Sequence, residues 1–131
     1  MKLAAQILSG LLAAFLAFNA FFYLFNPTAA GAANGLNPTT DFGITNMRLQ
    51  AGPLLMLALA AAAGAWKQNW IFLVPSVVTF LLFALIRVFG IFADGAEVAT
   101  IRGLILALVL FAVAEFAAIV FRQSERQSAE I

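Results

Sequence analysis

The feature that most constrains this chain is a set of four apolar segments, each long enough to cross a lipid bilayer. A bilayer core is spanned by about 20 residues of α-helix, and the segments occupy about residues 3–25, 48–66, 70–92 and 98–121. Apolar residues make up 64% of the 131 residues and charged residues only 10%, so little is left for a soluble domain. The sequence predicts an all-α integral membrane protein, folded as a single transmembrane domain.

The connections between the segments predict how they are ordered. Only Lys67-Gln68-Asn69 separates the second from the third segment, and about residues 93–97 separate the third from the fourth, so these neighbours should be antiparallel. The first connection, residues 26–46, is long and contains two Asn-Pro pairs. We expect an up-down bundle of four transmembrane helices, a long extracytoplasmic loop at 26–46, and a polar C-terminal tail at 122–131.

The positive charges predict an orientation. Lys2, Lys67, Arg122 and Arg126 lie in termini and a short connection at one end of the bundle, where the positive-inside bias is read. We therefore expect both termini to be cytoplasmic.

The composition also excludes classes of chemistry. With no cysteine and no histidine, the chain lacks thiolate nucleophiles, imidazole bases, Cys/His zinc sites and histidine-ligated haem. A net charge of +1 offers no broad field for nucleic acid. Asp41, Asp94 and Glu97 do not follow a calcium-loop pattern. We expect no catalytic residues, enzymatic activity, metal site, cofactor or nucleic-acid partner.

Three arginines are the main candidate site. Arg87 lies seven residues before Asp94, which places it about 10 Å from the outer end of its helix. Arg48 and Arg102 fall near the same level. One interpretation is that all three snorkel and pair with the rim acids Asp41, Asp94 and Glu97. The other is that they form a pocket for an anion, either a lipid phosphate or a carboxylate, with Asn19 and Asn46 adding hydrogen bonds.

Glu115 is a separate intramembrane acid, seven residues before Arg122. By counting residues along the helices, Gln6, Ser9, Ser76 and Thr79 fall near its depth. Either Glu115 is neutral or hydrogen-bonded and ties helices together, or it serves as a ligand or proton site.

Several of these residues carry a resemblance. Asn46-Met47-Arg48 leading to Gly52, Arg87, Asp94-Gly95 and Glu115 together resemble a bacterial family of small four-helix integral membrane proteins catalogued as a domain of unknown function. The chain differs from the usual pattern at Gly52-Pro53, where typical members carry a second glycine. The resemblance implies the same fold and polar positions, and a location in a bacterial inner membrane.

The small residues predict close helix packing. Ala5, Ser9, Ala13 and Ala17 recur at every fourth position of the first segment, and Gly52, Met56, Ala60 and Gly64 do so in the second. We interpret the chain as a non-enzymatic accessory subunit or scaffold that contacts membrane lipids and a partner membrane protein or further copies of itself. The alternative is a protein that binds a lipid or small amphiphile through Arg48, Arg87, Arg102 and Glu115.

Overall fold

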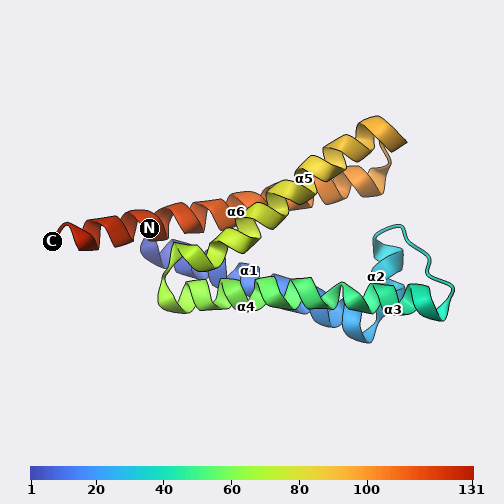
Figure 1. Cartoon of the computed structure of the whole chain (residues 1–131), viewed down its shortest axis with the longest axis horizontal. Helices are drawn as coiled ribbons and strands as arrows, with labels where there is room; N and C mark the ends of the chain where they lie inside the picture. Colours follow the sequence, from blue (N-terminus) through green and yellow to red (C-terminus); the bar gives the residue numbers. More distant parts are fainter.

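The computed structural model describes residues 1–131 and is helical, without strands (Figure 1). Its elements are α1 (Lys2–Phe25), α2 (Pro27–Ala33), α3 (Asp41–Leu49), α4 (Ala51–Lys67), the 3-10 helix η1 (Trp70–Leu73), α5 (Val74–Asp94) and α6 (Val98–Ala129). Four stretches are long and apolar enough to cross a membrane: α1, α3 with α4, η1 with α5, and α6. The structure therefore agrees with a membrane-embedded four-helix bundle.

The connection at 26–46 is more ordered than the sequence suggested. Pro27 opens α2, where its missing N–H costs nothing, and α3 begins at Asp41. The Thr40 hydroxyl caps α3 by accepting a hydrogen bond from the Gly43 amide at 3.0 Å. The second span thus starts near Asp41 rather than at 48, with a break at Gln50. Within the connection only Asn26 and residues 34–40 lack helix.

The segment expected to be a polar tail is also helical. α6 continues to Ala129 and has 32 residues, about 48 Å at 1.5 Å per residue. A bilayer core is about 30 Å thick, so the helix is longer than one crossing requires. Arg, Gln, Glu and Ala, which are strong helix formers, make up most of its last turns, and this accounts for the extension.

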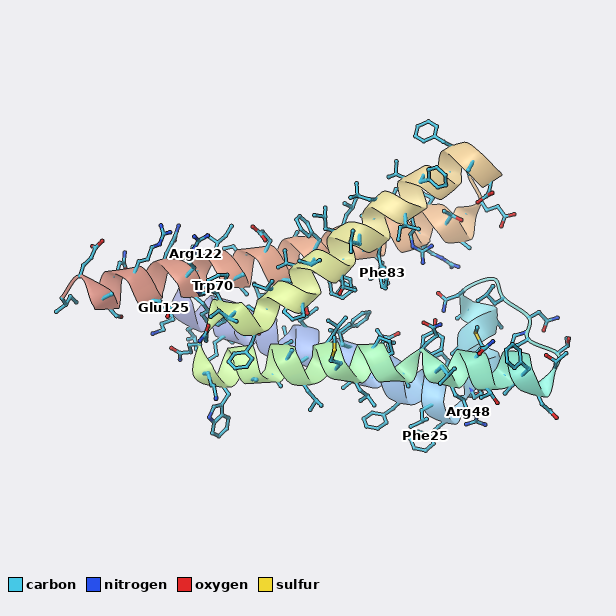
Figure 2. All side chains as sticks on the ribbon, in the orientation of Figure 1. Phe25, Arg48, Trp70, Phe83, Arg122 and Glu125 are labelled. Carbon is cyan, nitrogen blue, oxygen red and sulfur yellow. The ribbon has the colours of Figure 1, made fainter.

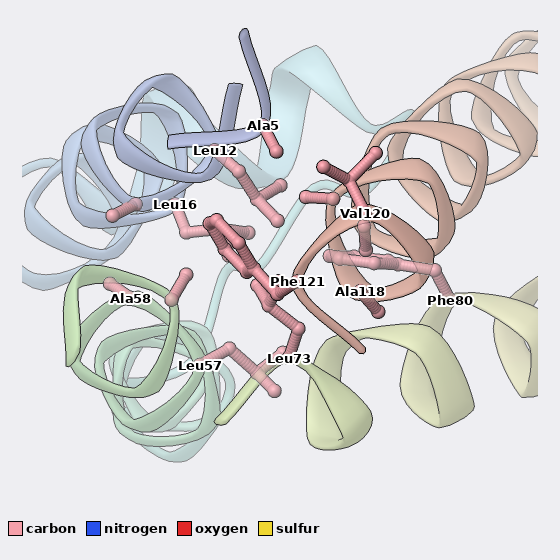
Figure 3. Close-up of a cluster of buried hydrophobic side chains, with 14 residues drawn as sticks. Ala5, Leu12, Leu16, Leu57, Ala58, Leu73, Phe80, Ala118, Val120 and Phe121 are labelled. Atoms are coloured by element: carbon pink, nitrogen blue, oxygen red, sulfur yellow. The ribbon is translucent and has the colours of Figure 1, made fainter. Parts of the chain in front are cut away.

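The bundle has two ends that differ in what they contain. The terminal end holds both chain termini and the turn from Lys67 to Trp70; the loop end holds α2, α3 and the turn at Gly95 (Figure 1). α1 packs along α4, and α5 packs along α6. The buried apolar cluster joins these two pairs, and Phe121 of α6 lies at its centre, fully buried (Figure 3).

Of the four small residues predicted to pack on α1, three are buried and Ala17 is half-buried. Ala5 and Ser9 have no exposed surface, and Ala13 is also buried. The Ser9 hydroxyl donates a hydrogen bond to the Ala61 carbonyl at 2.8 Å, which fixes the register of the two helices. The face predicted for the second span is wrong in part, because Gly52 and Met56 are exposed. The buried residues of α4 are instead Ala51, Leu57, Ala58, Ala61 and Gly64.

At the loop end the two helix pairs diverge. Figure 1 shows α5 and the start of α6 leaving the line of α1 and α4. The last buried residue of α5 is Ala84, although the helix continues to Asp94. In α6 only Ala107 is buried before Ala114. The core therefore closes the terminal half of the bundle, and the loop-end half of α5 and α6 forms an arm with little packing against the rest of the chain.

Candidate functional site

Arg48 connects α3 to the end of α1. It lies in the last turn of α3 and donates a hydrogen bond to the Leu24 carbonyl. The last four carbonyls of a helix lack partners within that helix and form the negative end of its dipole. Arg48 therefore stabilises the C-terminal end of α1, next to Phe25 (Figure 2).

Arg102 makes an equivalent contact between α6 and α2. Its Nη2 donates to the carbonyl of Ala33, the last residue of α2, at 3.4 Å. Close by, a Cβ placed on Gly35 would lie 3.6 Å from the Cβ of Ala99. These contacts join the loop to the start of α6 at the loop end of the molecule.

Arg87 is held differently, against a glycine. It is half-buried in α5, and its guanidinium group lies over Gly103 of α6. A Cβ added at Gly103 would be 2.7 Å from Nη2 of Arg87, closer than real Cβ contacts allow. The hydrogen bonds that guanidinium groups donate within the chain are those of Arg48 and Arg102. Arg87 thus has a fitted place between two helices and unused donors.

The acids at the same rim do not pair with the arginines. Asp41 lies in the first turn of α3, and Glu97 immediately precedes α6, so both carboxylates lie at positive helix ends. Asp94 at the end of α5 is exposed. Arg48 and Arg102 instead reach the negative ends of other helices. The predicted ion pairs are absent: Asp41 and Glu97 meet positive helix ends and Arg48 and Arg102 meet negative ones. Asp94, at the C-terminal end of α5, meets neither an arginine nor a positive helix end.

The predicted amides also lie apart from the guanidinium groups. The Asn19 amide donates to the Phe15 carbonyl of its own helix at 2.9 Å, and Asn46 is half-buried on α3 without a side-chain hydrogen bond. A different pair was missed by the sequence interpretation. Asn34 donates to the Tyr23 hydroxyl, joining α1 to the end of α2. The one signal for it is that the only tyrosine in the chain lies near a predicted helix end.

Glu115 is half-buried in α6 and makes no hydrogen bond within the chain. Gln6 and Ser9, which were expected at its depth, bond instead to α4, Gln6 donating to the Ala65 carbonyl at 3.0 Å. The Ser76 hydroxyl is fully buried without a partner. Hydrogen bonds therefore do not connect the predicted inner polar layer.

Taken together, the loop end offers hydrogen-bond donors from several elements. The structure brings Arg102 to the end of α2, Arg48 to the end of α1, and Arg87 to the face of α6. It contains no group of three acids, histidines or cysteines that could hold a metal ion. Guanidinium groups with free donors recognise carboxylates and phosphates, so the chemistry available here is anion binding.

Comparisons of the chain with protein-family models, curated proteins and solved structures find no match. The resemblance described from the sequence therefore stays a prediction, and function has to be argued from the geometry.

Proposed function

We propose that the protein is a non-enzymatic accessory subunit or scaffold of a membrane protein complex, and that its partner binds the loop-end arm of α5 and α6. In this proposal the helices cross a bacterial inner membrane in up-down order, with both termini cytoplasmic and the 26–46 connection outside. The observation that carries the proposal is Arg87, a guanidinium group fitted against Gly103 on an arm that the chain's own core does not cover.

The arm is apolar over most of its surface. Ile86, Phe89 and Phe92 of α5 are 64%, 72% and 86% exposed, and Ile105 of α6 is 57% exposed. Lipid alone tolerates such a surface, so apolarity does not by itself require a protein partner. It does mean that a partner helix would meet exposed apolar side chains on both helices of the arm.

The charge on the arm supplies the stronger argument. Arg87 lies about 10 Å from the end of α5. An arginine at the centre of a spanning helix costs about 2.5 to 3.5 kcal/mol, which is an upper bound for Arg87 because it lies off centre. Neither Asp94 nor Glu97, the nearest acids in sequence, forms an ion pair with it. A carboxylate on a partner helix would offset that cost and give the association a defined register.

Site-specific photo-crosslinking from two matched positions tests the proposal. Phe89 on the arm and Leu59 on α4 are both 72% exposed. A photoreactive amino acid would replace each in turn, with crosslinking performed in the native membrane. We expect one discrete crosslinked protein band from position 89 and lipid adducts alone from position 59.

The same experiment can contradict the proposal. Equal crosslinking to protein from both positions would indicate random encounter, and lipid adducts alone from position 89 would leave the arm without a protein partner. Replacing Arg87 by Gln in the position-89 protein should weaken the band if the guanidinium group meets an acid of the partner.

A second candidate function is binding of an anionic lipid or small amphiphile at the loop end. It is favoured by the same free donors of Arg87, since a phosphate would satisfy them as well as a carboxylate would. Glu115, half-buried further along α6, is the other residue assigned to this candidate. Native mass spectrometry of the gently extracted protein should then show a retained lipid that Arg87→Gln removes. An unchanged number of retained lipids after replacement of Arg48, Arg87 and Arg102 together would exclude the arginine site.

A further inference from the structure

The terminal end contains a cavity of about 230 Å³ that the proposed function does not use. Its lining comes from three separate parts of the chain: the start of α1, the turn between α4 and η1, and the last turns of α6. No hydrophobic residue contributes to it. The lining residues are Lys2, Lys67, Gln68, Asn69, Ser124, Glu125 and Ser128.

The donors around the cavity suit a phosphate group. Lys2 and Lys67 belong to the lining, and together with the single carboxylate of Glu125 they give it a net charge of +1. The Lys67 ammonium group lies 5.5 Å from the centre of the Phe72 ring, at the edge of this lining. The Asn69 side-chain oxygen accepts from the Ile71 amide at 2.9 Å, so its NH₂ group is free to donate. Ammonium and amide groups are donors of the kind that recognise phosphate oxygens.

Aromatic residues place the cavity at the level of lipid headgroups. Trp66, 86% exposed, immediately precedes Lys67, and Trp70 lies at the other end of the same turn. Tryptophans of membrane proteins collect at the interface between hydrocarbon and water. Arg122 lies 5.2 Å above the Trp70 ring, and Figure 2 shows both with Glu125 at this end of the bundle.

We propose that this cavity binds the headgroup of an anionic phospholipid from the surrounding leaflet. Lys2 and Lys67 hold the phosphate, and Glu125 accepts hydrogen bonds from headgroup hydroxyl groups. Basic pockets between transmembrane helices at the membrane surface take lipid headgroups in this manner. The site is separate from the loop-end arginines: Figure 2 shows Arg48 at the end of the molecule opposite Arg122 and Glu125.

The test uses the full chain, stripped of lipid in mild detergent and then mixed with equal amounts of phosphatidylglycerol and phosphatidylcholine. Native mass spectrometry measures which lipid stays bound. We expect retained phosphatidylglycerol, and a loss of at least about tenfold in Lys67→Gln, since a charge-assisted hydrogen bond is removed. Arg126→Gln removes an equal charge from the same end of α6 outside the cavity and should change retention by less than about threefold, because exposed charges are screened.

A second variant, Ser124→Leu, keeps the net charge of the cavity lining but fills the cavity with a larger side chain. Ser124→Leu should abolish retention while leaving the unfolding temperature within the range of the Arg126→Gln control. Unchanged retention in Ser124→Leu, or equal losses in Lys67→Gln and Arg126→Gln, would overturn the cavity assignment.

A soluble phosphate ester could bind to the same donors as a lipid headgroup. Glycerol phosphate, added in excess, should fail to displace the lipid if the acyl chains contribute to binding. Displacement, or an equal retention of phosphatidylcholine, would overturn the lipid assignment. Arg87→Gln should leave this adduct intact, so its loss in that variant would also count against a site at the terminal end.

Discussion

Replacing Gly103 by Ala is the most informative single change in this molecule. The new Cβ would lie 2.7 Å from Nη2 of Arg87, so the guanidinium group has to move. Because that group is the far end of a flexible side chain, the move costs about 0.5–1.5 kcal/mol of rotamer energy. Alanine gains up to about 1 kcal/mol over glycine in helix propensity. The two terms nearly cancel, and we expect stability to stay within about 0.5 kcal/mol of the wild type.

Function should respond far more strongly than stability. If displacement of Arg87 removes one charge-assisted hydrogen bond to a partner or lipid, about 1.5–3 kcal/mol is lost, which corresponds to at least about a tenfold loss of binding. The assay combines thermal unfolding in detergent with the yield of the crosslink from position 89. Gly10→Ala is the control, because a Cβ there meets nothing within 4 Å. Unchanged crosslinking in Gly103→Ala would refute the role given to Arg87.

Three further predictions concern the terminal-end core and are measured by unfolding in detergent. Phe121→Ala should lower the free energy of unfolding by about 3 kcal/mol or more by opening a cavity. Phe92→Ala, at a residue that is 86% exposed, should change it by less than about 0.5 kcal/mol. Equal losses would contradict a core confined to one half of the bundle. Ser9→Ala should cost about 0.6 kcal/mol by removing its hydrogen bond to α4, and no loss would mean that packing alone sets this register. Gly64→Ala should cost about 1–3 kcal/mol, because its Cβ would come within 3.3 Å of Leu73; a gain in stability would show that η1 yields easily.

Much of the helical framework could be predicted from hydropathy, because each span is a long apolar run and short polar connections separate the last three spans. The ordered connection could not be predicted as readily. Asn-Pro pairs and glycines indicate irregular backbone, yet Pro27 also opens α2, and the Thr40 cap makes Asp41 a helix start. The divergence at the loop end has no sequence signal, since exposed and buried apolar residues look alike in a chain surrounded by lipid.

The candidate site, too, could be predicted from the sequence only in part. The depth of Arg87 follows from counting residues, but its position over Gly103 depends on the crossing of α5 and α6. Charge counting favoured ion pairs for Arg48 and Arg102. The ends of α1 and α2 provided carbonyl acceptors, at Leu24 and Ala33, that composition does not reveal. For the same reason Tyr23 and Asn34 went unnoticed until the loop had a structure.

The most direct test of the central claim is native mass spectrometry of the protein extracted gently from its own membrane, in parallel with Arg87→Gln. The account predicts an assembly of one discrete mass, which exceeds the mass of a single 14.0 kDa chain plus its bound lipid. In Arg87→Gln this assembly should lose its partner protein. A monodisperse 14.0 kDa protein with no other polypeptide, identical in both samples, would contradict the assignment of this chain as a subunit.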